Sequence, residues 1–205
     1  MPKGSPELTA ARRNEIIDAC EKLYEMKSFK EITVAMIADL TSFTRASIYN
    51  YFKNKEEIFL ALLQREYAFW NESLQEILEG KALGIREFAE AVASSLDERG
   101  QLLKLLSMNH YDMEEHSRIE NLTDLKREYG RSLFLMEACV AKSFPDMGQN
   151  ERRDFVYTFF PELFGVYAYT MVTPKQTEAM DAAGVRFVGL TVHDLVRNSV
   201  QRLLS

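Results

Sequence analysis

The segment of residues 33–58, TVAMIADLTSFTRASIYNYFKNKEEI, constrains the fold more than any other part of the chain. Three residues that commonly cap helices follow one another in it: Thr33, Thr44 and Asn54. Threonine and asparagine are favoured just before a helix because their side-chain oxygens accept a backbone N–H that otherwise lacks a partner. The segment therefore predicts two short helices around a tight turn, followed by the start of another helix.

Apolar residues at helical spacing would hold these short helices rigid. Ile48 and Phe52 stand four positions apart and so share one face, while Ile37 lies on the inner face of the preceding helix. Phe43 and Ile48 flank the Thr44 cap in the positions of a hydrophobic staple, which fixes the direction in which the chain enters a helix. Polar residues are left to face outward.

The outward-facing side chains have the chemistry of DNA contacts. Arg45, in the first turn of its helix, can donate two hydrogen bonds to O6 and N7 of guanine. Hydroxyl groups nearby can reach phosphates, and Lys55 places a cation beside a helix N-terminus, which itself favours phosphate. The predicted DNA-binding residues are Thr33, Thr44, Arg45, Ser47, Tyr49, Asn50, Tyr51 and Lys55. Ordinary packing for Tyr49 and an ordinary surface position for Arg45 are the alternatives.

The charge balance agrees with a DNA contact confined to the N-terminal part. The chain of 205 residues has a net charge of −6. Residues 1–55 hold nine Lys and Arg against seven Asp and Glu, a net +2, whereas residues 56–205 hold sixteen against twenty-four, a net −8. Basic side chains attract phosphates, so the N-terminal excess favours the same end of the chain as the caps do.

The rest of the chain has helical rather than alternating periodicity, and no run of residues is typical of a strand. A first helix is predicted at about residues 8–27, and later helices at about 55–79, 85–98, 101–111, 118–143, 150–172, 174–183 and 186–204. The fold class is therefore all-α, with about nine to ten helices. Residues 1–54 are expected to form a three-helix helix-turn-helix domain, and residues 55–205 a second, C-terminal helical domain.

The N-terminal segment resembles the TetR (tetracycline-repressor) family of transcriptional regulators, over about residues 10–60. The resemblance rests on Thr33-Val34, Ile37-Ala38, Phe43-Thr44, Ser47-Ile48-Tyr49, Tyr51-Phe52 and Lys55-Glu56-Glu57-Ile58. Two positions depart from the pattern, because Ser42 and Ala46 stand where the family has glycines. Ser42 is expected to take a left-handed conformation in the turn, at a cost of about 1 kcal/mol.

The resemblance implies an all-helical homodimer that binds double-stranded DNA at a palindromic operator, with residues 55–205 as the ligand-binding and dimerisation domain. A small-molecule effector in the C-terminal domain would pivot the fourth helix and spoil the half-site spacing, which is about 34–36 Å for adjacent major grooves on one face of DNA. The predicted function is a ligand-responsive regulator acting as a repressor. The alternative is a dimeric small-molecule-binding protein without functional DNA binding.

Aromatic and methionine side chains are dense in the C-terminal part. Regulators of the family bind effectors between their middle helices, and such a cavity is mostly apolar with a few polar groups. The candidate ligand-binding residues are Trp70, Met108, His110, Tyr111, Phe134 and Tyr167. The alternative is that these aromatic side chains simply form the core.

The last long helices are the predicted dimer interface, since the resemblance implies a bundle of two helices from each subunit. Their apolar residues spread over more than one face, which calls for cover beyond the domain itself. The candidate interface residues are Phe155, Phe159, Phe187, Leu190, Val192, Leu195 and Val196. Burial within one chain is the alternative.

A metal site or an enzyme finds little support in the sequence. His110, Asp112, Glu114 and His116 are close together, but their i, i+4 pairs point in different directions on a helix. No pattern of catalytic residues stands out, so no metal, no cofactor and no enzymatic activity are predicted.

The two cysteines and the hydropathy favour the cytoplasm. Cys20 and Cys139 are far apart and match no metal or redox spacing, which favours buried thiols in a reducing compartment. No segment approaches the roughly 18 apolar residues of a membrane span. The N-terminal residues lack the apolar region of a signal peptide.

Overall fold

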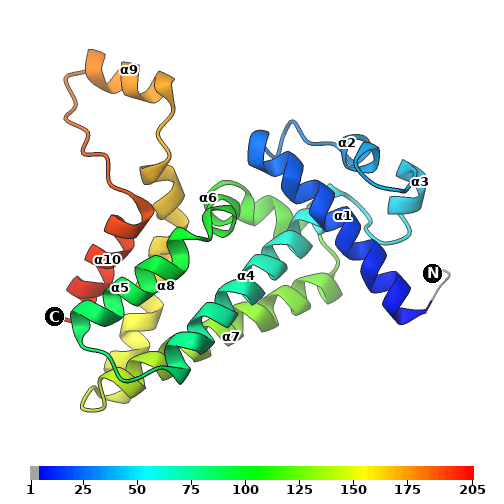
Figure 1. The fold of residues 1–205 in the computed structure, drawn as a ribbon. Coiled ribbons are helices and arrows are strands. Elements are labelled where there is room, and N and C mark those ends of the chain that lie inside the picture. The colour runs from blue at the N-terminus through cyan, green and yellow to red at the C-terminus, as the bar shows by residue number, and fades with distance from the viewer. Residues whose placement is uncertain (1–4) are drawn as a thin grey trace. The chain divides into compact units, whose positions relative to one another are not determined.

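The chain is helical throughout the part that the structure describes (Figure 1). This computed structural model describes residues 5–205, apart from the side chains of residues 108–110. Its ten helices are α1 (Pro6–Met26), α2 (Val34–Asp39), α3 (Arg45–Ile48), α4 (Lys55–Glu79), α5 (Ile85–Asp97), α6 (Gly100–Glu115), α7 (Ile119–Ser143), α8 (Gln149–Thr170), α9 (Pro174–Ala182) and α10 (Val192–Leu203). The predicted all-α fold class is confirmed.

Two compact units divide the chain. The first comprises Met1–Glu66 and Asn109–Tyr129, and the second comprises Tyr67–Met108 and Gly130–Ser205. Helices α4, α6 and α7 each contribute residues to both units. The first unit therefore contains more than the predicted domain of residues 1–54, because it includes the first turns of α4 and a segment from much later in the chain.

The core of the first unit forms around one side of α1. Its buried residues include Ile16, Cys20, Leu23 and Tyr24, which stand at the spacing of one helix face. Phe59 of α4 receives the edges of two rings, with the centroid of Tyr24 at 5.1 Å and that of Phe29 at 4.8 Å. Arg65, two turns further along α4, pairs with Asp18 and Glu21 on the rim of the same contact. Aromatic packing and these ion pairs together fix α1 against α4.

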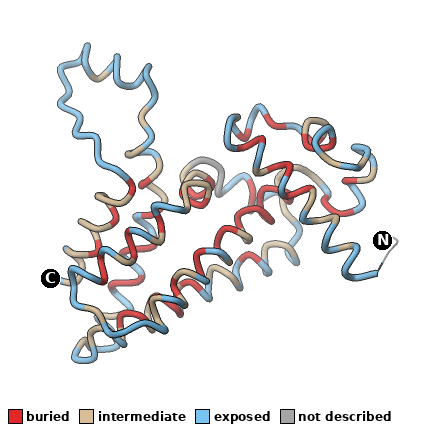
Figure 2. The backbone as a smooth tube through the Cα atoms, viewed as in Figure 1, coloured by how far each residue is buried: buried red, intermediate tan, exposed pale blue. Residues whose placement is uncertain are grey.

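Aromatic residues form the core of the second unit. Trp70 is fully buried, donates its indole N–H to Ser95 Oγ at 3.1 Å, and packs against Phe160 with ring centroids 5.5 Å apart. Phe155 stacks on Phe159 at 5.9 Å. Figure 2 shows the buried residues along the inward sides of the helices and the exposed residues outside. The aromatic residues of the second unit thus pack into its core.

Most helix ends lie within two residues of the predicted positions, and two predictions were wrong. The helix predicted at residues 101–111 continues to Glu115. The helix predicted at residues 186–204 begins only at Val192, because Thr191 caps α10 and forms a capping box with Asp194. Gly184, at φ 68°, closes the preceding helix. Phe187 and Leu190 consequently lie in an irregular segment rather than on the last helix.

The hydropathy of the helices bears on membrane insertion. Among the residues that the structure describes, none of the helices combines the length and the apolar character that crossing a membrane requires.

Candidate nucleic-acid interface

Side-chain caps start the three helices of the segment that carries the predicted DNA contacts. Thr33 Oγ1 accepts a hydrogen bond from the backbone N–H of Met36 at 3.3 Å, and Thr44 Oγ1 accepts one from Ser47 at 3.3 Å. Asn54 Oδ1 accepts the N–H of Glu57 at 2.9 Å. The predicted caps of α2, α3 and α4 are confirmed.

Helix α3 is held by its apolar side and presents its polar side to solvent. Ile48 and Phe52 are buried, as predicted. The outer side exposes Thr44, Arg45 and Asn50, together with part of Tyr49. Arg45 Nη2 donates to the Tyr49 hydroxyl at 3.4 Å, so the two side chains lie along the same face. The result is a short rigid helix with a guanidinium, two hydroxyls and an amide on its free side.

The turn between α2 and α3 adopts a different conformation from the predicted one. Among the described residues, no residue other than glycine has a positive φ, so Ser42 is not left-handed. Instead, Glu15 of α1 binds it twice: the Ser42 N–H donates to Oε1 at 2.6 Å, and the Ser42 hydroxyl donates to Oε2 at 3.2 Å. Thr41 Oγ1 accepts the N–H of Phe43 at 3.3 Å. Side-chain acceptors therefore stabilise the turn without a glycine.

Lys55 and Tyr51 have intramolecular partners in addition to their predicted contacts with DNA. Lys55 Nζ donates to the carbonyl oxygens of Phe29 at 2.8 Å and Ile32 at 3.2 Å, which lie in the loop before α2. The Tyr51 ring is buried, and its hydroxyl accepts a hydrogen bond from Arg12 Nη1 at 3.3 Å. Both side chains thus stabilise the fold of the first unit, and their phosphate contacts stay predictions.

A buried carboxylate links the start of α4 to the segment before α7. Glu57 is fully buried, and Arg118 holds it with two side-chain contacts, Nε–Oε1 at 2.6 Å and Nη2–Oε2 at 2.7 Å. The backbone N–H groups of Arg118 and Lys53 donate to the same carboxylate at 3.1 and 2.7 Å. Glu57 therefore accepts a hydrogen bond from the N–H of Lys53. In a capping box it would instead accept one from the N–H of the cap residue, Asn54.

The surroundings of Glu57 determine its protonation. Burial alone would raise its pKa, but the hydrogen bonds from Arg118 and from the two backbone N–H groups together lower the pKa of Glu57 below the usual value. The Asn54 amide adds a further link, donating from Nδ2 to the carbonyl oxygen of His116 at 2.8 Å. Glu57 belongs to the segment that carries the family resemblance, but nothing in the sequence marked Arg118, which lies 61 residues away.

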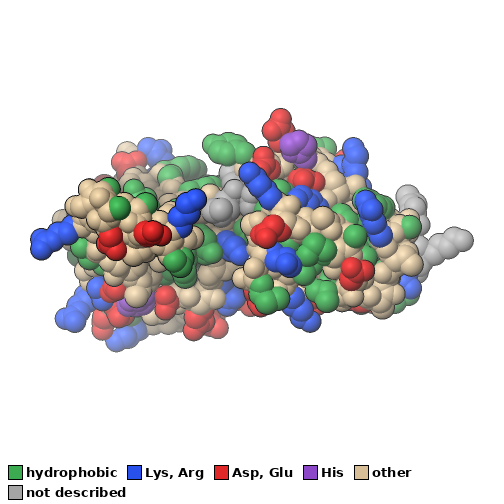
Figure 3. Space-filling model, turned by 90° about the horizontal axis from the view of Figure 1, so that it is seen from above, with side chains coloured by type: hydrophobic (Ala, Val, Ile, Leu, Met, Phe, Trp, Pro, Cys, Tyr) green, Lys and Arg blue, Asp and Glu red, His purple; other side chains and the backbone are tan. Residues whose placement is uncertain are grey.

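Charged side chains of both signs are intermingled on the face drawn in Figure 3. Residues 1–55 have a net charge of only +2. Any contact of this segment with phosphates would therefore depend on individually placed cations rather than on a broad basic surface.

Two models of protein families match the chain and together cover most of it. Residues 16–62 match "Bacterial regulatory proteins, tetR family", and residues 64–205 match "Tetracyclin repressor-like, C-terminal domain". The chain belongs to the tetR family. This confirms the resemblance noted in the sequence, and a family of regulatory proteins supports the prediction that the chain is not an enzyme.

Two curated relatives match a shorter part of the chain. The HTH-type transcriptional repressor Rv1474c of Mycobacterium tuberculosis is 29% identical over 66 residues, 32% of this chain and 35% of the relative. The HTH-type transcriptional regulator HbdR of Aromatoleum sp. is 26% identical over 87 residues, 42% of this chain and 38% of the relative. The match thus spans little more than a third of the length of either relative.

Solved structures share the fold of the tetR-family chain over nearly its whole length. A TetR/AcrR-family regulator from Thermobifida fusca has a TM-score of 0.65 at 18% identity, covering 95% of this chain and 97% of the other. FadR from Bacillus subtilis, solved with stearoyl-CoA, has a TM-score of 0.62 at 17% identity, covering 93% and 97%. At such identities the comparison shows the fold alone.

The candidate ligand-binding residues of this tetR-family chain have very different surroundings. Trp70 is part of the core, and Tyr167 is half-buried, which raises its pKa. Tyr111 and Phe134 are 84% and 68% exposed, more than the wall of a closed cavity would allow. Met108 and His110 lie outside the side chains that the structure describes. The ligand site stays a prediction.

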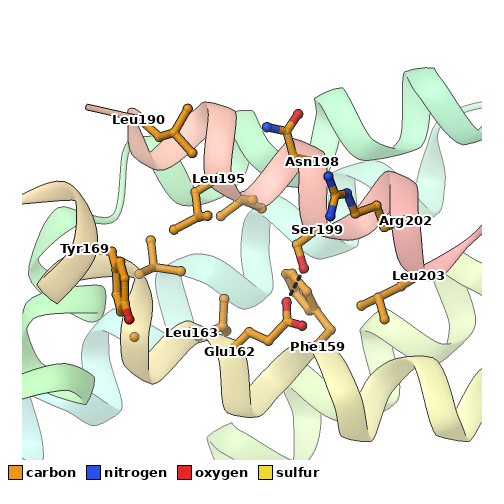
Figure 4. A pocket seen from close by; sticks show the side chains of 13 residues that line it. Phe159, Glu162, Leu163, Tyr169, Leu190, Leu195, Asn198, Ser199, Arg202 and Leu203 are labelled. Atoms are coloured by element: carbon orange, nitrogen blue, oxygen red, sulfur yellow. Dashed lines mark hydrogen bonds between the residues drawn. The ribbon is translucent and has the colours of Figure 1, made fainter. Parts of the chain in front are cut away.

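A groove of 530 Å³ runs between α8 and α10 in the second unit (Figure 4). Four of the seven candidate interface residues line it: Phe159, Leu190, Leu195 and Val196. Glu162 accepts a hydrogen bond from the Ser199 hydroxyl across the groove. The other three candidates do not line the groove. Phe155 and Val192 are buried within the chain, and Phe187 is exposed. Phe155 packs against Phe88 and Phe159, which gives it a role in the core.

Proposed function

We propose that the protein is a homodimeric, ligand-responsive transcriptional regulator that binds DNA through α3 and acts as a repressor. The observation that carries the proposal is the outer side of α3, where Arg45 and its polar neighbours are exposed while Ile48 and Phe52 anchor the helix. A short helix held rigidly by a partner helix is how a helix-turn-helix reads the major groove. The two curated relatives are named as a repressor and a regulator of this type.

The side chains of α3 divide between base reading and positioning. The guanidinium of Arg45 would read guanine, since it can donate to O6 and N7 together. Thr44 and Tyr49 would contact phosphates through their hydroxyls and so set the register of the helix. Asn50 has an amide that suits either task. This division predicts that Arg45 contributes sequence specificity and that the hydroxyls contribute affinity.

A second copy would pack on the groove between α8 and α10. Its lining is mostly apolar, with Leu163, Leu190 and Leu195 among its residues. A two-fold dimer presents the same patch from both copies, so an apolar groove and its rim can cover each other. Two-fold symmetry in the protein is matched by a palindromic operator, with half-sites about one helical turn of DNA apart.

A small molecule bound in the second unit would release the operator. FadR from Bacillus subtilis was solved with stearoyl-CoA, and we infer for this chain only that its own effector binds within the helical second unit. Helix α4 begins at the Asn54 cap and contributes its later turns to the second unit, which gives a covalent path for the signal. An effector would act by binding more tightly to a conformation that does not fit the operator.

DNA binding is tested by fluorescence anisotropy with the DNA upstream of the gene itself, at two salt concentrations. The expected result is sequence-specific binding that weakens with salt, and a loss of at least about tenfold for Arg45→Ala, which removes a bidentate base contact. Arg127→Ala is the matched control, since Arg127 is an exposed arginine on α7 and its removal should leave binding unchanged. The absence of any sequence-specific binding would instead support a dimeric small-molecule-binding protein.

A further inference from the structure

Residues 171–191 of the second unit, which we call the arm, are exposed at all but two positions. The arm contains α9 and the irregular segment that follows it. Val172 and Met180 are half-buried, and the other residues of the arm are exposed. Figures 1 and 2 show it standing away from α8 and α10, the two helices that it connects. The arm therefore has little packing of its own.

Local hydrogen bonds set the conformation of the arm. The N–H of Thr173 donates to Gln176 Oε1 at 2.9 Å, and the N–H of Gln176 donates back to Thr173 Oγ1 at 3.3 Å. At the other end, Gly184 takes the left-handed conformation that ends a helix, and the N–H of Val185 donates to the Met180 carbonyl at 2.9 Å. Helix α9 has nine residues, and isolated helices shorter than about 12–15 residues are marginal in water. None of its residues is buried, so a contact with another surface would stabilise the arm.

The exposed side chains of the arm are apolar in one stretch. Val185, Phe187, Val188 and Leu190 fall within six residues and are 53%, 42%, 73% and 36% exposed. Large apolar side chains grouped on a surface mark a contact with another macromolecule, whereas single ones are ordinary. The stretch of residues 185–190 is therefore the contact surface of the arm.

The net charge of the arm indicates which class of macromolecule it would contact. Its two basic residues, Lys175 and Arg186, are balanced by two acidic ones, Glu178 and Asp181, which gives a net charge of zero. Nucleic acids and anionic membrane surfaces both bind segments with an excess of Lys and Arg. An apolar stretch of zero net charge fits a protein surface that is itself apolar.

The arm adjoins the groove on which the second copy is proposed to pack. Leu190, at the end of the apolar stretch, and Tyr169, just before the arm, both line the groove between α8 and α10 (Figure 4). A partner that covers the groove therefore also covers Leu190, one end of the exposed stretch. In a two-fold dimer each copy would offer its arm to the other.

We propose that the arm of each protomer packs through residues 185–190 on the other copy and extends the interface beyond the groove. This inference rests on the proposed dimer. It assigns a role to Phe187, which is too exposed to belong to the core of one chain, and to Val188, which the sequence did not single out. Contact with the second copy would then hold the arm in place.

The test compares dimer dissociation constants by sedimentation equilibrium on the full chain. The double variant Phe187→Glu with Val188→Glu should raise the dissociation constant at least about tenfold, because it places two like charges per copy in a desolvated contact. Its circular dichroism and denaturation midpoint, measured at a concentration where the wild type is monomeric, should be unchanged. Met26→Glu, at an apolar position that is 81% exposed outside the arm, is the matched control and should leave the dissociation constant unchanged.

A photo-crosslinking side chain placed at position 188 identifies what the arm touches. The proposal requires both a weakened dimer in the double variant and a crosslink between two copies. An unchanged dissociation constant, or a crosslink only within one chain, would overturn it while the dimer itself stands. A wild-type chain that stays monomeric at all concentrations would overturn the proposed dimer and the arm contact with it.

Discussion

Helices α3 and α9 are both short, yet they are held in opposite ways. Helix α3 has only four residues, but it sits between a Thr44 cap and the buried side chains of Ile48 and Phe52. Helix α9 has nine residues, a capping box at its start and a left-handed glycine at its end, but no buried residue. The signals at the helix ends are stronger for α9, whereas buried side chains hold only α3 in place.

The difference shows what caps do and what burial does. Caps supply partners for terminal backbone groups and so decide where a helix begins and ends, at about 1 kcal/mol each. Burial of apolar side chains fixes a helix in place, and for short helices it contributes most of the stability. The proposed role of α3 in reading DNA requires a rigid helix, which packing provides. The arm, in contrast, would gain its packing only in the proposed dimer.

Removal of an apolar anchor from α3 should have the largest effect. Ile48→Ala leaves a cavity at a fully buried position and is expected to lower the free energy of unfolding by about 2–5 kcal/mol. Val185→Ala, the matched substitution in the arm, should change it by less than about 0.5 kcal/mol, because the side chain is exposed. Urea denaturation at a concentration where the chain is monomeric measures both. Equal losses would show that the two segments are held alike.

Thiol reactivity should separate the packed core from the arm by at least about a hundredfold in rate. Burial raises the pKa of Cys20 and raises that of Cys139 to about 11, so neither forms much thiolate at pH 8. A cysteine introduced as Val188→Cys, at a position that is 73% exposed, should react with a thiol reagent far faster in dilute, monomeric protein. Its reactivity should then fall as the protein concentration rises and the partner covers it. Rapid reaction of the native cysteines would contradict the burial on which the comparison depends.

The Glu57–Arg118 pair should have an intermediate effect, because it fixes the first unit by polar contacts. Arg118→Ala leaves a buried carboxylate with only backbone donors and is expected to cost about 2 kcal/mol, less than a wholly buried pair would, since Arg118 itself is 48% exposed. Arg127→Ala, an exposed arginine nearby in the sequence, is the control.

The same pair should show a dependence on pH. Because the pKa of Glu57 is lowered in the folded state, its contribution is present above its unfolded pKa of about 4.3 and is lost as the pH falls through the lower folded value. The difference in stability between wild type and Arg118→Ala should therefore shrink below about pH 4. A difference that stays constant down to pH 2.5 would mean that Glu57 does not carry the effect.

The turn before α3 should show the smallest effect. Glu15→Ala removes two hydrogen bonds to Ser42 at an exposed site, so it is expected to lower the free energy of unfolding by about 0.5–1 kcal/mol and to weaken DNA binding slightly. Asn14→Ala, at an exposed neighbour on α1, is the control. Denaturation and anisotropy titrations check the two parts of the prediction. No change in either would assign the stability of the turn to Thr41 and the backbone.

The sequence determined what depends on near neighbours. The caps at Thr33, Thr44 and Asn54, the buried pair of Ile48 and Phe52 and the start of α4 were all predicted, because a cap and an i, i+4 pair involve residues within about one turn of each other. The family resemblance followed from the same segment. These predictions needed only the spacing of residue types within that segment, and they were confirmed.

The tertiary structure decided what depends on distant partners. The sequence suggested a left-handed Ser42, but Glu15 of α1 supplies the acceptor that stabilises the turn in an ordinary conformation. The partner of Glu57 is Arg118, which lies 61 residues away. One error was local: the last helix was predicted too long because Phe187 and Leu190 are apolar, whereas the capping box of Thr191 and Asp194 starts it later. Spacing along a chain determines local geometry, whereas the pairing of remote side chains depends on how the helices pack, and that exists only in the folded molecule.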